Sequence, residues 1–292
     1  MRDARERLLK RCRETIAPLA VNVDRDARFP EESLTALREE RLLAAAFPED
    51  LGGSGATLTE LVELCETTAR ACASTGMVLA MHFIQALCIC QHGRRQPFFA
   101  NYAAHAAREQ LLLASATSEE GVDGNMRASI AAIREAPPRF SLAKRCTTVS
   151  YGEHADALLI TARRSESASP SDQVIVLLRK ADFRAQLLRP WNTLGMRGTC
   201  SPAMLIEAEA ALEQIFETPF HVIASQTMTP AAHLLWSSVW LGIAGDALDR
   251  TMRLVRSRTH ATAPGERLGR SRLLETVATF SRVTGLCSAT DP

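Results

Sequence analysis

The side chains that could do chemistry in this sequence are its histidines, its cysteines and one serine in a glycine-rich run. The seven histidines are spread along the chain without the spacing of a metal site, so no metal is expected. The closest cysteine pair, Cys88 and Cys90, has C-x-C rather than C-x-x-C spacing, which indicates buried thiols and not a zinc or redox site. Ser54 lies in GGSGA, where Ala56 replaces the second glycine of a nucleophile elbow, so an α/β-hydrolase is not expected. These residues identify no catalytic group.

Common nucleotide-binding fingerprints are also missing from the sequence. There is no G-x-G-x-x-G run and no G-x-x-x-x-G-K-[ST] run, so neither a nicotinamide-type Rossmann site nor a phosphate-binding P-loop is expected. Lysine and arginine number 34 against 33 aspartates and glutamates, which gives a formal net charge of +1. A nearly neutral chain has no electrostatic attraction for a polyanion, so nucleic acid is not an expected partner.

Length and composition indicate a folded protein. The chain has 292 residues, of which 46% are hydrophobic and 23% charged, close to the averages of globular domains. It begins without the apolar run of a signal peptide, so a cytoplasmic location is expected. The most apolar stretch, residues 228–248, contains Pro230 and His233, which would be costly facing lipid. We expect a buried core helix there and no membrane span.

The periodicity of the apolar residues changes twice along the chain. Residues 1–110 keep helical spacing and predict an N-terminal α-helical domain, in which the capping-box pair Thr57 and Glu60 starts one helix. Residues 111–220 switch to short β-rich runs broken by prolines, which predicts a middle β domain, an antiparallel barrel or sandwich. The runs are 129–133, 139–142, 157–162, 174–178 and 203–208. Helical spacing returns in residues 221–292, so the expected fold class is α+β, with strands and helices segregated rather than alternating.

Four segments, in this order, resemble motifs of the flavin-dependent acyl-CoA dehydrogenase family. They are FPEDLGGSG (47–55), TSEEGVDGN (117–125), VSYGEHADALLITAR (149–163) and NTLGMRGT (192–199). Each is weak evidence alone, and TSEEGVDGN by itself is typical of an ordinary polar loop. Together they span most of the chain, and the family has the same order of helical, β and helical domains. The resemblance implies that residues 221–292 are the start of an incomplete C-terminal helical domain.

The resemblance implies an FAD cofactor, which the family binds without a dinucleotide fingerprint. In the family's T-E-P-x-A-G-S-D loop, a hydroxyl and backbone N–H groups contact the flavin. Gapless matching carries these contacts to the segment's Thr117, Ser118, Gly121 and Gly124, with Gly124 standing where the family has a serine.

A second family segment, W-I-T-N-G, matches residues 148–152. There a tryptophan packs on the flavin ring and a threonine bonds it, so the resemblance implies cofactor contacts at Thr148 and Ser150. Thr148 replaces the tryptophan, a loss of stacking worth roughly 1 kcal/mol unless Tyr151 covers the ring instead. The alternative for Ser150 and Tyr151 is a hairpin turn. The family's arginine that reaches the FAD of a neighbouring subunit matches Arg258, for which a solvated basic run is an equal alternative.

The family's reaction is α,β-dehydrogenation of an acyl thioester, with a glutamate as base and hydride transfer to FAD. One group of the family carries that glutamate on the helix after the β domain, where this sequence has Ala231 or Ala232. The commoner group carries it near the C-terminus, in a segment that this sequence does not contain. The catalytic residue is therefore unknown, and the resemblance implies a flavoprotein oxidoreductase that is inactive as this chain.

Two alternatives stay open beside that dehydrogenase. One is a flavin-dependent monooxygenase of the same fold, which needs no α-proton base. The other is a non-catalytic remnant or acyl-binding subunit. The partners implied by the resemblance are acyl-CoA or another acyl thioester from fatty acid metabolism, and further copies of the chain, because the family forms dimers or tetramers.

Overall fold

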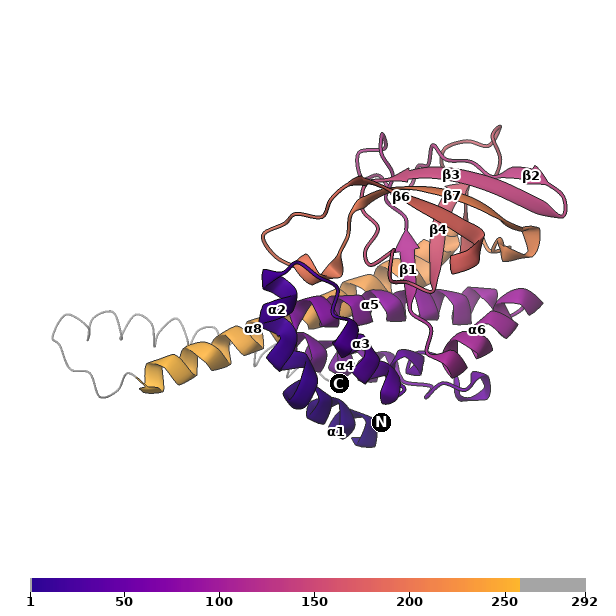
Figure 1. Ribbon diagram of the computed structural model, residues 1–292. Helices are drawn as coiled ribbons and strands as arrows, with labels where there is room; N and C mark the ends of the chain where they lie inside the picture. Colours follow the sequence, from indigo (N-terminus) through magenta and orange to yellow (C-terminus); the bar gives the residue numbers. More distant parts are fainter. Residues whose placement is uncertain (1, 258–292) are drawn as a thin grey trace.

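The computed structural model describes residues 2–257, in which a β-rich segment separates two groups of helices. Figure 1 shows the strands as an upper layer over α5, α6 and α8. The first group contains α1 (Arg2–Arg11), η1 (Cys12–Ile16), α2 (Ala17–Arg25), α3 (Glu31–Glu39), α4 (Leu58–Ala71), α5 (Ala73–Cys88), η4 (Ile89–Gly93) and α6 (Pro97–Glu109). The second contains α7 (Phe220–Ile223), η8 (Ala224–Met228) and α8 (Thr229–Ser257), where η1, η4 and η8 are π-helical turns. The predicted α+β class is confirmed.

Helix α4 begins at the predicted capping box. The Glu60 N–H donates to Thr57 Oγ1 at 3.3 Å, and the Thr57 N–H donates to the Glu60 carboxylate at 2.8 Å. Two donors that the first helical turn leaves unpaired are thereby satisfied. The buried side of the helix then packs inward through Leu61, Leu64, Cys65, Thr68 and Ala69.

Small residues allow α4, α5 and α8 to approach one another closely. A Cβ atom added to Gly76 of α5 would lie 2.7 Å from Cα of Ala69 in α4. One added to Gly242 of α8 would lie 2.4 Å from the Glu66 carbonyl oxygen, also in α4. Neither distance is possible for a real side chain, so glycine is required at both contacts unless the backbones separate.

Helix α5 is the apolar centre of this layer. By length and composition Ala73–Gly93 could cross a membrane, with a mean hydropathy of 1.6, but 78% of that window is buried inside the fold. A core helix of a folded domain has the same properties. Helix α5 is thus more apolar than residues 228–248, the stretch that the sequence analysis singled out. It contacts α4, α8 and the first strand.

The β segment folds into two sheets. The strands are β1 (Leu113–Ala116), β2 (Arg134–Ala136), β3 (Arg139–Cys146), β4 (Ala157–Arg163), β5 (Gln173–Arg179), β6 (Phe183–Arg189) and β7 (Ala203–Ala211). One sheet has the order β1-β4-β5 and the other β2-β3-β7-β6. All pairings are antiparallel, as expected, except that β1 and β4 run parallel.

One predicted strand is wrong, and three observed strands have no counterpart in the prediction. Residues 129–133 form only an isolated bridge, in which the Ala131 carbonyl and the Ile133 N–H bond to Arg163 at the end of β4. The bridge extends no further, because the Ser129 N–H donates to the Pro170 carbonyl and the Ala131 N–H to the Glu119 carboxylate. The strands β1, β2 and β6 are short or exposed, and their burial does not alternate. Periodicity therefore gave them no signal.

His82 joins the helical layer to the sheets. The Leu113 N–H at the start of β1 donates to His82 Nδ1 at 3.1 Å, so Nε2 carries the proton and donates to the Leu43 carbonyl at 2.7 Å. The ring is completely buried, and desolvation lowers its pKa to about 4. The neutral imidazole is thus a fixed part of the fold.

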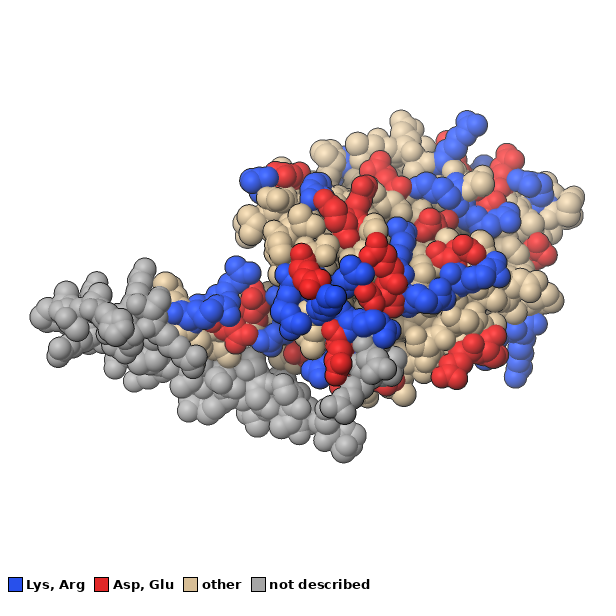
Figure 2. All heavy atoms as spheres, turned by 60° about the horizontal axis from the view of Figure 1, so that its bottom comes forward, with Lys and Arg blue, Asp and Glu red and all other residues tan. Residues whose placement is uncertain are grey.

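Ion pairs join α1 to the end of α3. Arg11 contacts Glu39 at 3.0 Å and Glu40 at 2.7 Å, and Arg7 contacts Glu40 at 3.0 Å. Figure 2, turned so that the bottom of Figure 1 comes forward, shows basic and acidic side chains interspersed on this face. Exposed pairs contribute only about 0–1 kcal/mol each, so burial of apolar residues such as Leu8 and Ile16 holds these helices.

We predict that protonation of His82 weakens the fold at mildly acidic pH. Its pKa is about 4 in the folded chain and about 6.5 when exposed, so the unfolded state binds the proton more readily, and stability present above pH 6.5 is lost as pH falls towards 4. Between pH 7.5 and pH 5 the loss from this group is about 2 kcal/mol. Urea unfolding of the wild type and of His82→Gln at both pH values measures it. Equal pH dependence in the two proteins would contradict the assignment.

Candidate functional site

Two segments far apart in the sequence meet at Ser118 and Thr148. The Ser118 hydroxyl donates to the Thr148 carbonyl oxygen at 2.8 Å and accepts from the Thr148 N–H at 3.1 Å. Ser118 is partly exposed and Thr148 is exposed. The structure therefore brings together two of the residues for which the sequence predicts cofactor contacts, and it leaves them open to solvent.

Ser150 lies beside the end of the 192–199 motif. Its hydroxyl oxygen accepts from Ser201 Oγ at 2.9 Å, and Ser201 is in turn bonded to Thr199 Oγ1 at 2.8 Å. Arg197 fixes this loop to the helical layer, because its Nε donates to the Asp24 carbonyl at the end of α2 at 2.8 Å. A chain of hydroxyl groups thus supports the partly exposed Ser150.

Tyr151 is not available to cover a cofactor ring. Its side chain is only 1% exposed, and its hydroxyl donates to the Leu113 carbonyl at 2.9 Å. Residues 150–154 form a turn, and Tyr151 has a left-handed backbone with φ +42°. With Thr148 in place of the family's tryptophan, this segment presents hydroxyl groups and no aromatic face.

The loop after β1 contains three residues with left-handed backbone. Gly121, Asp123 and Gly124 have φ angles of +89°, +50° and +75°, and all three are exposed. The N–H groups of Asn125 and Ala128 already donate within the loop, to the carbonyls of Val122 and Asn125. Thr117, at the start of the loop, accepts at its carbonyl oxygen from Lys144 Nζ at 3.5 Å, so this atom has a structural contact, and the cofactor contact of Thr117 stays a prediction.

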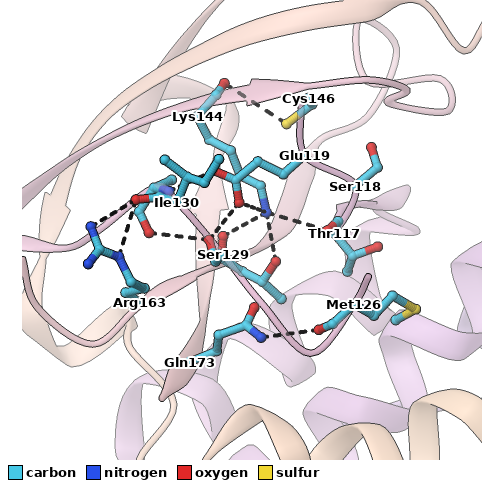
Figure 3. Close-up of polar contacts among 12 residues, drawn as sticks. Thr117, Ser118, Glu119, Met126, Ser129, Ile130, Lys144, Cys146, Arg163 and Gln173 are labelled. Carbon is cyan, nitrogen blue, oxygen red and sulfur yellow. Dashed lines mark hydrogen bonds and ion pairs between the residues drawn. The ribbon is translucent and has the colours of Figure 1, made fainter. Parts of the chain in front are cut away.

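A buried ion pair lies beneath this loop, and sequence reasoning missed it (Figure 3). Lys144 Nζ is 3.7 Å from Glu119 Oε2, and the two side chains are 0% and 4% exposed. Burial lowers the pKa of Lys144, because an ammonium group loses its hydration there. A signal was present in the sequence, since Lys144 occupies an inward position of the alternating strand RFSLAKRC. Nothing in the sequence marks Glu119 as its partner.

A cavity of about 890 Å³ adjoins the end of the same loop. One wall is Met126 and Arg127, held in place because Gln173 Nε2 donates to the Met126 carbonyl at 3.1 Å (Figure 3). The opposite wall comes from α7, η8 and the start of α8, including His221 and His233. The other lining residues are Ser171, Phe220, Ala224, Ser225, Thr229 and Pro230.

The ionisable side chains among the described residues that line this cavity are all basic. Its described lining contains one arginine and two histidines, several hydroxyl groups and no aspartate or glutamate. Ala231 and Ala232, the positions matched to the family's glutamate, are buried at 4% and 8% exposure. The cavity is therefore suited to an anionic or polar ligand and holds no carboxylate base among the residues that the structure describes.

Two predictions of the sequence analysis remain, the cofactor contact of Arg258 and the expectation of no metal. Arg258 lies outside the described residues. Within residues 2–257, no group of three or more histidine, cysteine, aspartate or glutamate side chains could hold a metal ion.

Comparison with known proteins identifies the fold and the family that the N-terminal residues match. Residues 1–96 match the family model described as acyl-CoA dehydrogenase, N-terminal domain. A cyclohex-1-ene-1-carbonyl-CoA dehydrogenase of Geobacter metallireducens is 24% identical over 253 residues, which cover 85% of this chain and 66% of that protein. This chain therefore matches slightly less than two thirds of that relative's length.

Two solved structures share the fold over almost all of the chain. Butyryl-CoA dehydrogenase from Megasphaera elsdenii superposes with a TM-score of 0.83 at 15% identity, covering 98% of this chain and 76% of that one. Dibenzothiophene monooxygenase (TdsC) from Paenibacillus sp. A11-2 gives a TM-score of 0.77 at 21% identity, with 97% and 75% covered. With the four sequence motifs and the segregated α+β architecture, these matches show that residues 1–96 have the sequence of an acyl-CoA dehydrogenase N-terminal domain and that the described chain has the acyl-CoA dehydrogenase fold.

Proposed function

We propose that this protein is a flavin-dependent oxidoreductase that binds an acyl thioester. The observation that carries the proposal is the cavity with basic and hydroxyl side chains beside the loop of the predicted cofactor contacts. Coenzyme A thioesters carry phosphates, and Arg127, His221 and His233 provide cationic or hydrogen-bonding groups for them. Apolar side chains such as Met126 and Phe220 can contact the acyl part.

The residues present fit the polar parts of a flavin. Ser118 and Ser150 supply hydroxyl groups on partly exposed surfaces, and Gly121, Asp123 and Gly124 belong to an exposed loop that begins beside Ser118. A bound flavin supplies the acceptor for the hydride or electrons that leave the substrate. This chain's own part is to hold the ring's polar edge, orient the thioester in the cavity and exclude water. A structure of TdsC with FMN bound supports FMN as an alternative to FAD.

The described lining of the cavity lacks the carboxylate that usually serves as base in the dehydrogenation. Removing the α-proton of a thioester needs a base within about 3 Å of that proton. Ala231 and Ala232 cannot accept a proton, and the described cavity lining offers no carboxylate. We therefore propose α,β-dehydrogenation as the ancestral chemistry, with turnover by this chain much slower than that of a glutamate-bearing enzyme.

The same observation favours a second candidate, a flavin-dependent monooxygenase. That chemistry requires no α-proton base, and the fold is shared with dibenzothiophene monooxygenase. A third candidate is an acyl-binding subunit that keeps the cavity without redox turnover.

The protein is further proposed to act as a homo-oligomer in the cytoplasm. Helix α8 exposes Leu234, Trp236 and Trp240, with exposed fractions of 48%, 40% and 54%. Large apolar side chains gathered on one helix are typical of a protein contact. The cytoplasmic location is supported by cysteines that stay unpaired in the described chain.

An anaerobic titration separates the three candidates. Protein loaded with FAD is mixed with butyryl-CoA while the flavin absorbance is followed. Bleaching by the thioester supports the dehydrogenase. Bleaching only by dithionite, followed by oxygen consumption in the presence of substrate, supports the monooxygenase. A spectral shift without either supports the acyl-binding subunit, and no response at all contradicts thioester binding at this site.

We predict that Ser118→Ala weakens flavin binding, since it removes a hydroxyl from the predicted contact and releases Thr148. The loss of one hydrogen bond, about 1 kcal/mol, corresponds to roughly a fivefold higher Kd. FAD and FMN titrations followed by flavin fluorescence measure it, with Ser167→Ala, an exposed serine of the β4–β5 loop, as the matched control. Wild-type protein that retains no flavin after desalting would refute the cofactor proposal.

We also predict that the cavity recognises the negative charge of a coenzyme A thioester. Arg127→Met combined with His233→Gln is expected to raise the Kd for butyryl-CoA about tenfold at low ionic strength and less at high salt. Arg134→Met is the control, because Arg134 is an exposed arginine of β2 that pairs with Glu166 and does not line the cavity. Isothermal titration calorimetry at two salt concentrations provides the measurement, and equal affinities in both variants would argue against this ligand position.

A further inference from the structure

The buried pair of Glu119 and Lys144 holds both ends of the loop that follows β1 (Figure 3). At the loop's beginning, Lys144 Nζ contacts the Thr117 carbonyl at 3.5 Å. At its end, the Glu119 carboxylate accepts from Ser129 Oγ and from the Ala131 N–H, both at 2.6 Å. The residues between these anchors include Ser118, Gly121 and Gly124.

Lys144 also connects the loop to both sheets. It projects from β3, in the four-stranded sheet, and donates to Thr161 of β4, in the three-stranded sheet. The distances are 2.9 Å to the Thr161 carbonyl and 2.7 Å to its hydroxyl. The ammonium group is therefore held by two hydrogen bonds to β4, and from this fixed position it attracts the carboxylate of Glu119.

The residue with the predicted cofactor contact is adjacent in sequence to the residue with the buried carboxylate. Ser118, whose hydroxyl bonds to Thr148 at the surface, is followed directly by Glu119, whose carboxylate points into the interior. One planar peptide unit joins the two residues, so holding the backbone of Glu119 in place also limits where the backbone of Ser118 can lie. Figure 3 shows the Ser118 side chain directed away from the buried cluster.

We propose that Glu119 and Lys144 are positioning residues, a buried electrostatic anchor that fixes the cofactor loop of residues 117–131 on the two sheets. The inference rests on the proposed flavin function for its purpose. It does not rest on flavin for its geometry, which is a property of the chain alone. Pre-organising a binding loop in this way avoids the cost of ordering it when the ligand binds.

The test compares a buried pair with the surface pair next to it. The double variant Glu119→Gln/Lys144→Met removes the anchor without leaving a lone buried charge. Glu120 and Arg145 are the chain neighbours of these residues and form an exposed ion pair at 2.8 Å, so Glu120→Gln/Arg145→Met is the matched control. If the first variant fails to fold, Ser129→Ala, which deletes one partner of the carboxylate, takes its place.

Hydrogen exchange of the flavin-free proteins is the first readout. We expect the amides of residues 129–133 to exchange at least about tenfold faster in the anchor variant, while the β3–β7 amides and the surface-pair control stay unchanged. Equal loosening of β3–β7 would mean a general structural role and would overturn the proposal. Unchanged exchange in the loop would overturn it as well.

Flavin affinity is the second readout. The Kd for FAD is expected to rise about tenfold or more in the anchor variant and to stay within about twofold in the control. Unchanged affinity in a folded anchor variant would overturn the positioning role. Wild-type protein that binds no flavin would overturn the proposed function, while the exchange measurement would still decide whether the anchor sets the loop.

Discussion

A buried ammonium group is the constraint on which the β segment depends. Lys144 gives up its hydration to lie between the two sheets, and a charge in such a place is stable only when every donor has a partner. Thr161 on β4, and Thr117 and Glu119 at the start of the loop after β1, supply those partners. The spacing of the sheets and the path of the following loop are thereby linked to one side chain.

The helical layer meets a different requirement, close contact between backbones. Ala69 lies where Gly76 of α5 and Gly242 of α8 both come near α4, so three helices are fixed relative to one another without large interlocking side chains. His82 then joins α5 to β1. The cavity beside η8 inherits its shape from both layers, because one wall is attached to β5 and the other to α8.

Much of this arrangement could be predicted from the sequence, and the exceptions have physical reasons. The capping box at Thr57 and Glu60 is a local pattern, and local patterns are legible without tertiary structure. Residues 129–133 have the composition of a strand, yet their donors are taken by Glu119 and Pro170, which no periodicity reveals. Motif matching implied cofactor contacts at both Ser118 and Thr148, but not the hydrogen bonds between them. Nor did it imply the pairing of Lys144 with Glu119, because the motif gives no information on which buried charges compensate each other.

The thiols of the described chain have a practical consequence. Seven cysteines are free, six of them buried, and only Cys200 is partly exposed. Burial raises the pKa of Cys12 and Cys88 to about 12, so little reactive thiolate exists while the chain is folded. Among the described cysteines, a thiol reagent added under native conditions therefore meets Cys200 first, and modification of the six buried ones records a transient opening around each of them. The reaction rates of the buried cysteines therefore measure local unfolding in α4, α5 and β3 without any added label.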